Sequence, residues 1–189
     1  MNRRDAVSRV ALLLGGTIVG AEFFLSGCKP ERKYGNAVDF STDDVAYLDE
    51  VADTIIPATN TPGAKAAAVG TFMTVMVKDC YEDKDQAIFR EGMKKLNESS
   101  KTKYGKEFLD ITPDQRKELL TEIDKEAKDH QKNKKEGDPN HYFTLMKQLT
   151  LLGYFSSKIG CEQALRYVAV PGRYEGCIPY KKGDKAWAT

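Results

Sequence analysis

Histidine and cysteine carry the most recognisable chemistry in this chain of 189 residues, and both are scarce. The two histidines are His130 and His141. His141 lies beside Tyr142 and Phe143 at the start of an apolar segment, which makes it the best single candidate for a polar functional group. A histidine at such a position usually caps the helix or packs against it. We therefore expect a capping or packing role for His141.

Motifs that hold cofactors or catalyse reactions are missing from the sequence. It has no Cys-x-x-Cys and no Cys-x-x-Cys-His, the spacings typical of iron–sulfur clusters and c-type haem. The dinucleotide pattern Gly-x-Gly-x-x-Gly, the Gly-x-Ser-x-Gly of hydrolases and the P-loop are absent too. Asp43, Asp44, Asp49 and Glu50 fall on the polar side of a surface helix, where solvation explains them. We expect no catalytic residue, no metal site and no cofactor in this chain.

Residues 1–27 have the build of a signal peptide. Arg3 and Arg4 form a charged start, residues 10–25 are mainly apolar, and Leu-Ser-Gly-Cys closes the segment at Cys28. Paired arginines are typical of the twin-arginine route, and the closing tetrapeptide resembles a lipobox, in which Cys28 is acylated. The alternative is a membrane-anchor helix, but the charge of Glu22 at a bilayer centre would cost about 2.5–3.5 kcal/mol. The sequence predicts export to the periplasmic side and a lipid anchor on Cys28.

The charge of the remaining chain argues against some partners. Without the signal segment, the 29 basic residues fall by three and the 28 acidic residues by two, so 26 of each remain. A net charge of zero gives no support for nucleic-acid binding or for a polybasic membrane patch. We expect no nucleic-acid partner.

Three cysteines follow Cys28, namely Cys80, Cys161 and Cys177. Outside the cytoplasm thiols tend to pair, so one bridge and one leftover thiol is the simplest arrangement. A bridge between Cys80 and Cys177 would hold a long C-terminal tail on the domain and would leave Cys161 reduced. Three unpaired thiols, or a bridge from Cys161 or Cys177 to a partner chain, are the alternatives.

The rest of the sequence predicts an all-α fold, a single compact bundle of about five helices with a loop-rich C-terminal tail. Residues 28–40 are predicted to be a tether, and residues 41–189 the helical domain. Ser41 with Asp44, and Thr112 with Gln115, are typical helix starts. Apolar residues recur at helical spacing in segments 41–56, 64–80, 83–96, 112–127 and 142–159, with a short helical piece at 162–167.

The helix predicted at 142–159 differs from the others because it is apolar nearly all round. Such a helix is either central to its own bundle or buried against a partner. The sequence leaves both alternatives open.

Two stretches of sequence are too unusual for generic helix and loop. Residues 53–64 read Asp-Thr-Ile-Ile-Pro-Ala-Thr-Asn-Thr-Pro-Gly-Ala. The second stretch combines Leu-Thr-Leu-Leu-Gly-Tyr-Phe at 149–155, Ala-Leu-Arg-Tyr at 164–167 and Pro-Gly-Arg-Tyr-Glu-Gly-Cys at 171–177. In order and spacing, and together with the paired arginines, these motifs resemble the gluconate 2-dehydrogenase subunit 3 family.

The resemblance implies a small, non-catalytic subunit that holds no cofactor of its own. Members of that family accompany a large FAD-containing oxidoreductase of the glucose–methanol–choline type, which acts on a sugar, sugar acid or polyol. A cytochrome c subunit often completes the complex. The small subunit carries the export signal for its partner. A free-standing envelope lipoprotein that acts as a binding or scaffold module is the alternative function.

Within this interpretation, the two stretches are candidates for the contact with the partner. A loop with two prolines loses little entropy on binding, and Tyr, Trp and Arg dominate interface hot spots. The alternative is that the aromatic residues complete the bundle's own core. The interface candidates are Pro57, Thr59, Pro62, Gly63, Tyr167, Arg173, Tyr174 and Trp187.

Overall fold

The computed structural model describes residues 39–170, 172–173 and 176–188. The chain divides into two units, residues 1–37 and 38–189, and the described residues all belong to the second. Arg3, Arg4, Cys28, most of the predicted tether and Tyr174 therefore lie outside the described residues.

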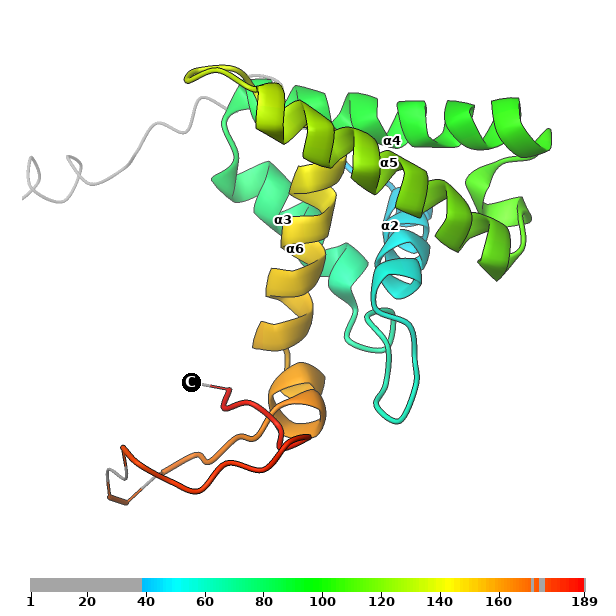
Figure 1. Cartoon of the computed structure of the whole chain (residues 1–189). Coiled ribbons are helices and arrows are strands. Elements are labelled where there is room, and N and C mark those ends of the chain that lie inside the picture. Colours follow the sequence, from blue (N-terminus) through cyan, green and yellow to red (C-terminus); the bar gives the residue numbers. More distant parts are fainter. Residues whose placement is uncertain (1–38, 171, 174–175, 189) are drawn as a thin grey trace, which may run out of the picture. The chain divides into compact units, whose positions relative to one another are not determined.

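The described residues are helical and contain no strand, as the sequence predicts (Figure 1). One isolated bridge joins Arg166 to Trp187. The elements are α2 (Thr42–Ile55), α3 (Val69–Cys80), α4 (Asp83–Tyr104), η1 (Phe108–Asp110), α5 (Pro113–Asn133), α6 (Tyr142–Ser156) and the π-helix η2 (Gly160–Ala164).

Both helix starts that the sequence marks most clearly are confirmed. The Ser41 hydroxyl accepts the Asp44 amide at 3.1 Å, and the Asp44 carboxylate accepts the Ser41 amide at 2.9 Å. Thr112 and Gln115 make the same reciprocal pair at the start of α5. These capping boxes satisfy amides that have no partner inside their own helix.

Helix α3 begins later than predicted, at Val69 instead of residues 64–66. Residues 64–68 form turns, and Ala68 has a left-handed backbone with φ +52°. The Asp49 carboxylate of α2 accepts the Gly70 amide at 2.7 Å and so caps the helix from outside. A cap supplied by another helix leaves no signal next to the helix start in the sequence.

The acidic face of α2 is more than a solvated surface, which corrects the prediction for Asp49 and Glu50. The Glu50 carboxylate contacts Arg116 of α5 at 2.5 Å and also pairs with Lys65. The hydrogen bond from Lys65 is the main reason that the pKa of Glu50 lies below its usual value, and the charges of Lys65 and Arg116 add to the effect. This cluster joins α2, α5 and the segment before α3.

Helix α6 ends at Ser156, earlier than the predicted residue 159. The amide and hydroxyl of Ser157 both donate to the Tyr154 carbonyl, at 3.1 and 2.7 Å. That carbonyl would otherwise accept the next helical bond, from Lys158. The short helical piece predicted at 162–167 is present as η2, shifted toward the N-terminus at Gly160–Ala164.

Helix α6 is the central element of the bundle. It contacts each of α2, α3, α4 and α5. Phe143, Met146, Leu149 and Tyr154 are buried on it. Gly153 allows close packing with α3, since a Cβ there would lie 2.6 Å from the Phe72 ring. The apolar character of α6 is thus explained in large part by the bundle's own core.

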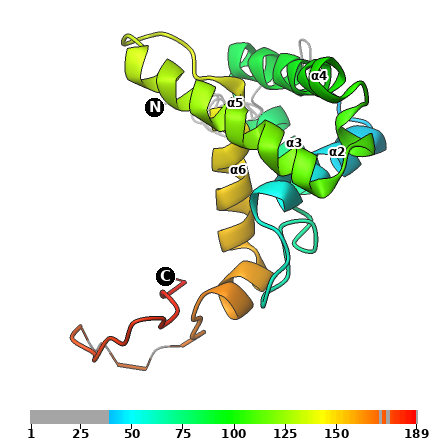
Figure 2. The ribbon, with the colours of Figure 1, turned by 45° about the vertical axis from the view of Figure 1, so that its right-hand side comes forward.

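The two ends of α6 meet different parts of the bundle. Helices α4 and α5 lie at its N-terminal end (Figures 1 and 2). The loop between α2 and α3 and the π-helix η2 lie at its C-terminal end (Figures 1 and 2). The two unusual stretches of sequence therefore converge at one end of the bundle.

Candidate functional site

The loop that follows α2 is held by its base. The Tyr154 hydroxyl of α6 donates to the Pro62 carbonyl at 2.7 Å, and the Ala64 amide donates to the Ile56 carbonyl at 2.9 Å. Gly63 is buried, and a Cβ there would lie 2.4 Å from Asp53 Oδ1. Gly63 is therefore required by the close approach of the chain, and it is not accessible to a partner.

The tip of the same loop is exposed. Pro57 and Thr59 are accessible, and Pro62 is half-buried. The Thr59 amide donates to the Thr61 carbonyl at 2.9 Å, which closes a small turn inside the tip. A tip ordered by its own bonds and by its base can meet a partner with little loss of conformational entropy.

The C-terminal half of α6 carries exposed apolar side chains. Leu151, Leu152 and Phe155 are 41%, 52% and 40% exposed. Their spacing places them on one side of the helix. We call these three residues the C-terminal apolar face. None of the three is among the individual residues predicted for the interface, although they belong to the unusual stretch at 149–155 and to a helix that is apolar nearly all round.

Exposure of large apolar side chains is concentrated in the last quarter of the chain. Of the exposed large hydrophobic residues in the described part, only Val75 and Leu109 precede residue 151. The others are Leu151, Leu152, Phe155, Tyr167, Val168, Val170, Ile178, Tyr180 and Trp187. Scattered apolar residues are normal on a protein surface, but a concentration of them in one region typically marks a contact surface.

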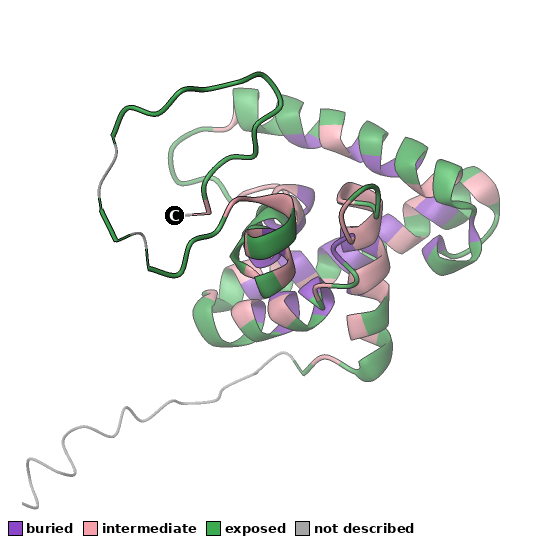
Figure 3. Ribbon diagram, turned by 90° about the horizontal axis from the view of Figure 1, so that it is seen from below, coloured by how far each residue is buried: buried purple, intermediate pink, exposed green. Residues whose placement is uncertain are grey.

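The predicted interface residues of the C-terminal tail have different environments. The described part of the C-terminal tail is largely exposed (Figure 3). Tyr167 and Arg173 are among its exposed residues. Trp187 is 48% exposed, but its ring stacks on the Arg166 guanidinium with 3.9 Å between the guanidinium carbon and the ring centre. Trp187 thus has a contact within the chain, which agrees in part with the alternative that the aromatic residues complete the domain itself.

The three described cysteines are free thiols in this structure. Cys80 and Cys177 are exposed, and Cys161 is half-buried with its thiol 3.2 Å from the Phe155 carbonyl. The structure therefore holds no bridge between Cys80 and Cys177, and their pairing stays a prediction.

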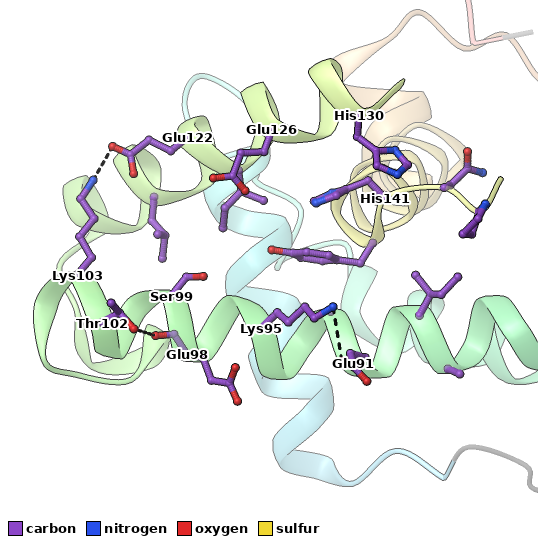
Figure 4. Close-up of a pocket in the computed structure, with 18 residues that line it drawn as sticks. Glu91, Lys95, Glu98, Ser99, Thr102, Lys103, Glu122, Glu126, His130 and His141 are labelled. Atoms are coloured by element: carbon purple, nitrogen blue, oxygen red, sulfur yellow. Dashed lines mark hydrogen bonds and ion pairs between the residues drawn. The ribbon is translucent and has the colours of Figure 1, made fainter. Parts of the chain in front are cut away.

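A groove of about 860 Å³ lies between α4 and α5 and is closed at one side by the start of α6 (Figure 4). His130, His141, Tyr142 and Glu126 meet there, with 5.8 Å between the two imidazole centres. The His141 Nδ1 accepts the Phe143 amide at 3.2 Å, which confirms the capping role. This bond uses the lone pair that a metal or a proton would need on that nitrogen.

The electrostatics of the groove follow from burial. Burial, and then the charge of His130, lower the pKa of His141 below its usual value. Burial raises the pKa of Tyr142 to about 12. Both groups are therefore neutral at pH 7.

Charged residues around the groove largely pair with each other. Lys103 contacts Glu118 and Glu122 at 2.8 and 2.6 Å, and Lys95 contacts Glu91 at 3.5 Å. No cluster of three or more His, Cys, Asp or Glu residues in the described ranges could hold a metal ion. The groove thus resembles a solvated seam between helices more than a catalytic centre.

The exposed apolar residues of the described chain gather in its last quarter, a concentration that is typical of a contact surface. The chain is a member of the gluconate 2-dehydrogenase subunit 3 family, whose model matches residues 42–172. Membership agrees with a subunit of a dehydrogenase complex. No curated protein and no solved structure gave a match. None of the helices in the described part of the chain is long and apolar enough to cross a membrane.

Proposed function

We propose that this chain is the non-catalytic small subunit of a periplasmic flavin dehydrogenase complex, and that it binds and co-exports the large subunit. The large subunit would be an FAD-dependent enzyme of the glucose–methanol–choline type that oxidises a sugar, sugar acid or polyol. FAD would reside in that partner, and a cytochrome c subunit would accept its electrons. The small chain would supply binding, export and a membrane anchor.

One observation carries the binding role, namely the C-terminal apolar face of Leu151, Leu152 and Phe155 at the end of α6 where the loop at 57–62 is also held. A small bundle gains free energy by covering such a face, at about 25 cal/mol per Å² of apolar surface buried. The groove between α4 and α5 gives no comparable reason for a partner, because its charges pair within the chain. Family membership supports the choice of a dehydrogenase as the partner.

Co-purification tests the binding role. The full chain with an affinity tag would be co-expressed with a candidate flavin-dependent large subunit, and the purified sample would be examined for FAD. We expect an equimolar complex with dehydrogenase activity, and a small subunit that alone has no flavin or haem absorption. A chain that purifies alone, or with unrelated envelope proteins, would support the free-standing lipoprotein instead.

The export role rests on Arg3 and Arg4. Replacing both with Lys should leave the precursor and the co-expressed large subunit in the cytoplasm. Arg9→Lys is the matched control, because it changes an arginine of the same segment outside the pair. Normal delivery of both subunits by the double variant would contradict the twin-arginine assignment.

The membrane anchor rests on Cys28. The Cys28→Ala variant should lose labelling by an acyl-chain analogue and should release the complex from membranes. Cys80→Ala is the control, since it removes an exposed cysteine that has no place in the lipobox. An unlabelled wild-type chain would refute the lipoprotein assignment.

A further inference from the structure

Charged residues are missing from two segments that are joined at the C-terminal end of α6. The loop segment, residues 54–64, and the helical segment, residues 149–157, contain no Asp, Glu, Lys or Arg, although 30% of the whole chain is charged. The Tyr154 hydroxyl of the helical segment donates to the Pro62 carbonyl of the loop segment at 2.7 Å. Two segments far apart in the sequence are thus uncharged and held together.

Both segments have an exposed side. Residues 57–60, which we call the loop tip, are all exposed, and so are the three residues of the C-terminal apolar face. An uncharged stretch inside a protein core is ordinary, because charged side chains are rarely buried. An uncharged stretch on the surface of this chain is not ordinary, since most exposed residues of α5, for example, are charged.

The charged residues that border these segments are engaged within the chain. Asp53 Oδ1 accepts the Lys65 amide at 3.3 Å, and the Lys65 ammonium pairs with Glu50. Lys147, which precedes the helical segment by two residues, pairs with Asp124 of α5 at 2.6 Å. These bordering charges therefore need no opposite charge from a partner.

The core of a protein–protein interface has the same character. Charged residues are depleted there, because a charge removed from water is unfavourable unless it is paired. Hydroxyl and amide groups are tolerated, since they can exchange hydrogen bonds with water for hydrogen bonds with the partner. Thr59 and Asn60 supply such groups at the loop tip, and the C-terminal apolar face supplies the apolar area.

We propose that the loop tip and the C-terminal apolar face form one docking surface, which binds an uncharged, apolar surface of the large subunit. This inference rests on the proposed function and adds which residues bind and what chemistry they recognise. Leu151, Leu152 and Phe155 would be buried in the contact, and Thr59 and Asn60 would form hydrogen bonds with the partner. Because no charge takes part, the affinity should be nearly independent of salt.

A protein surface fits these residues better than a lipid surface does. Segments that bind at a membrane surface typically place Lys or Arg beside their apolar residues, where they meet anionic lipid headgroups. The loop segment and the helical segment contain no basic residue. The exposed amide of Asn60 instead suits a partner that offers hydrogen-bonding groups in fixed positions.

Charges of both signs at Asn60 test the chemistry of the surface. The complex of the full-length chain with the large subunit would be titrated for the variants Asn60→Asp, Asn60→Lys and Leu152→Lys. An uncharged partner surface disfavours either sign of charge, so we expect each variant to lose affinity about tenfold. Gln131→Glu and Gln131→Lys are the matched controls at an exposed position of α5, and both should bind within about twofold of the wild type.

The salt dependence of the wild-type complex is a second readout that needs no variant. We expect its affinity to change less than about threefold between about 0.1 and 0.5 M salt. A loss of affinity of about tenfold or more over this range would overturn the inference, because it would show that charges drive the contact. Opposite effects of Asn60→Asp and Asn60→Lys would overturn it for the same reason.

Other outcomes separate this inference from the proposed function. Asn60 variants that bind like the wild type would overturn the inference, because the loop tip would lie outside the contact, while the binding function would survive. A wild-type chain that binds no large subunit would instead refute the proposed function. Binding of the Cys28→Ala chain to phosphatidylcholine vesicles that Leu152→Lys abolishes, with unchanged binding of the large subunit, would overturn the inference in favour of a lipid surface.

Discussion

The two ends of α6 differ in whether their side chains find partners within the chain. At the N-terminal end, His141 caps the helix, and Lys147 of the first two turns pairs with Asp124 of α5 at 2.6 Å. At the C-terminal end, the helix is fixed to the loop by Tyr154 and Pro62, yet Leu152 of the same turn is exposed. The polar groups named at the N-terminal end pair within the chain. At the C-terminal end the helix is held in position, but its apolar side chains are exposed to solvent.

This difference indicates where function resides. Charges and caps that find partners within a domain stabilise it and give no reason to expect a further contact. Exposed apolar side chains on a rigid support are costly in water and are favourable only when something covers them. Substitutions that fix the C-terminal end should therefore affect stability, and substitutions on its outer side should affect binding.

The largest expected effect is on the free energy of unfolding, at Gly63 in the base of the loop that is joined to the C-terminal end of α6. In Gly63→Ala the new Cβ would lie 2.4 Å from Asp53 Oδ1 and 2.7 Å from the Ala58 nitrogen. Because one of these neighbours is backbone, the base of the loop must shift, and we expect a loss of about 2–3 kcal/mol in the free energy of unfolding. Chemical denaturation measures it. Tyr180→Ala in the exposed C-terminal tail is the control and should leave stability unchanged. Equal losses would contradict the distinction between the buried base of the loop and the exposed tail.

The second-largest expected effect is on the affinity for the large subunit, at the C-terminal apolar face of α6. Leu152→Glu places a charge on the C-terminal apolar face, where the side chain is 52% exposed. The domain should keep its stability, since no core contact is removed, while affinity for the large subunit falls at least about tenfold, or about 1.4 kcal/mol. Titration calorimetry with the large subunit measures the affinity. Gln148→Glu, one turn earlier on the exposed side, is the control.

Local features of the fold could be predicted from the sequence. The starts of α2 and α5 depend on residues three positions apart, Ser41 with Asp44 and Thr112 with Gln115. Their hydrogen bonds form within one turn of helix, so spacing alone reveals them. The composition of α6 predicted that the helix is covered on most sides, but it left open whether the bundle itself or a partner covers it.

Features that depend on distant partners could not be predicted. The start of α3 is set by Asp49, 21 residues away from Gly70. The base of the loop is joined to α6 by the hydrogen bond of Tyr154 with Pro62, which are 92 residues apart. Spacing therefore identified the loop at 57–63 as unusual, but it could not separate residues that support the loop from residues that a partner can reach.

A third, smaller effect is expected at the contact that joins the loop to α6. Tyr154→Phe removes the hydroxyl that donates to the Pro62 carbonyl, and Tyr154 is only 2% exposed. The carbonyl then lacks its partner, so we expect a loss of about 1 kcal/mol in the free energy of unfolding. Tyr180→Phe, at a tyrosine that is 77% exposed, should cost nothing. An unchanged stability of Tyr154→Phe would show that the loop is not held at this point.

The smallest effect is expected at the polar end of α6, and it depends on pH. The pKa of His141 in the folded chain lies below its usual value of 6.5, first because of burial and then because of His130, with Lys95 adding to the shift and Glu126 opposing it. A folded pKa below the unfolded one means that the unfolded chain binds the proton more readily. The stability that neutral His141 contributes is therefore present above about pH 6.5 and is lost as the pH falls through the folded pKa.

His141→Asn separates the cap from the titration. Asparagine can accept the Phe143 amide as His141 Nδ1 does, so stability at pH 7.5 should change by only a few tenths of a kcal/mol. Between pH 7.5 and 5.5, however, the variant should lose less stability than the wild type, because no imidazole remains to be protonated at the cap. His130→Gln removes the neighbouring charge alone and should reduce the pH dependence only in part. If the free energy of unfolding depends on pH in the same way for the wild type and His141→Asn, protonation of His141 does not destabilise the domain.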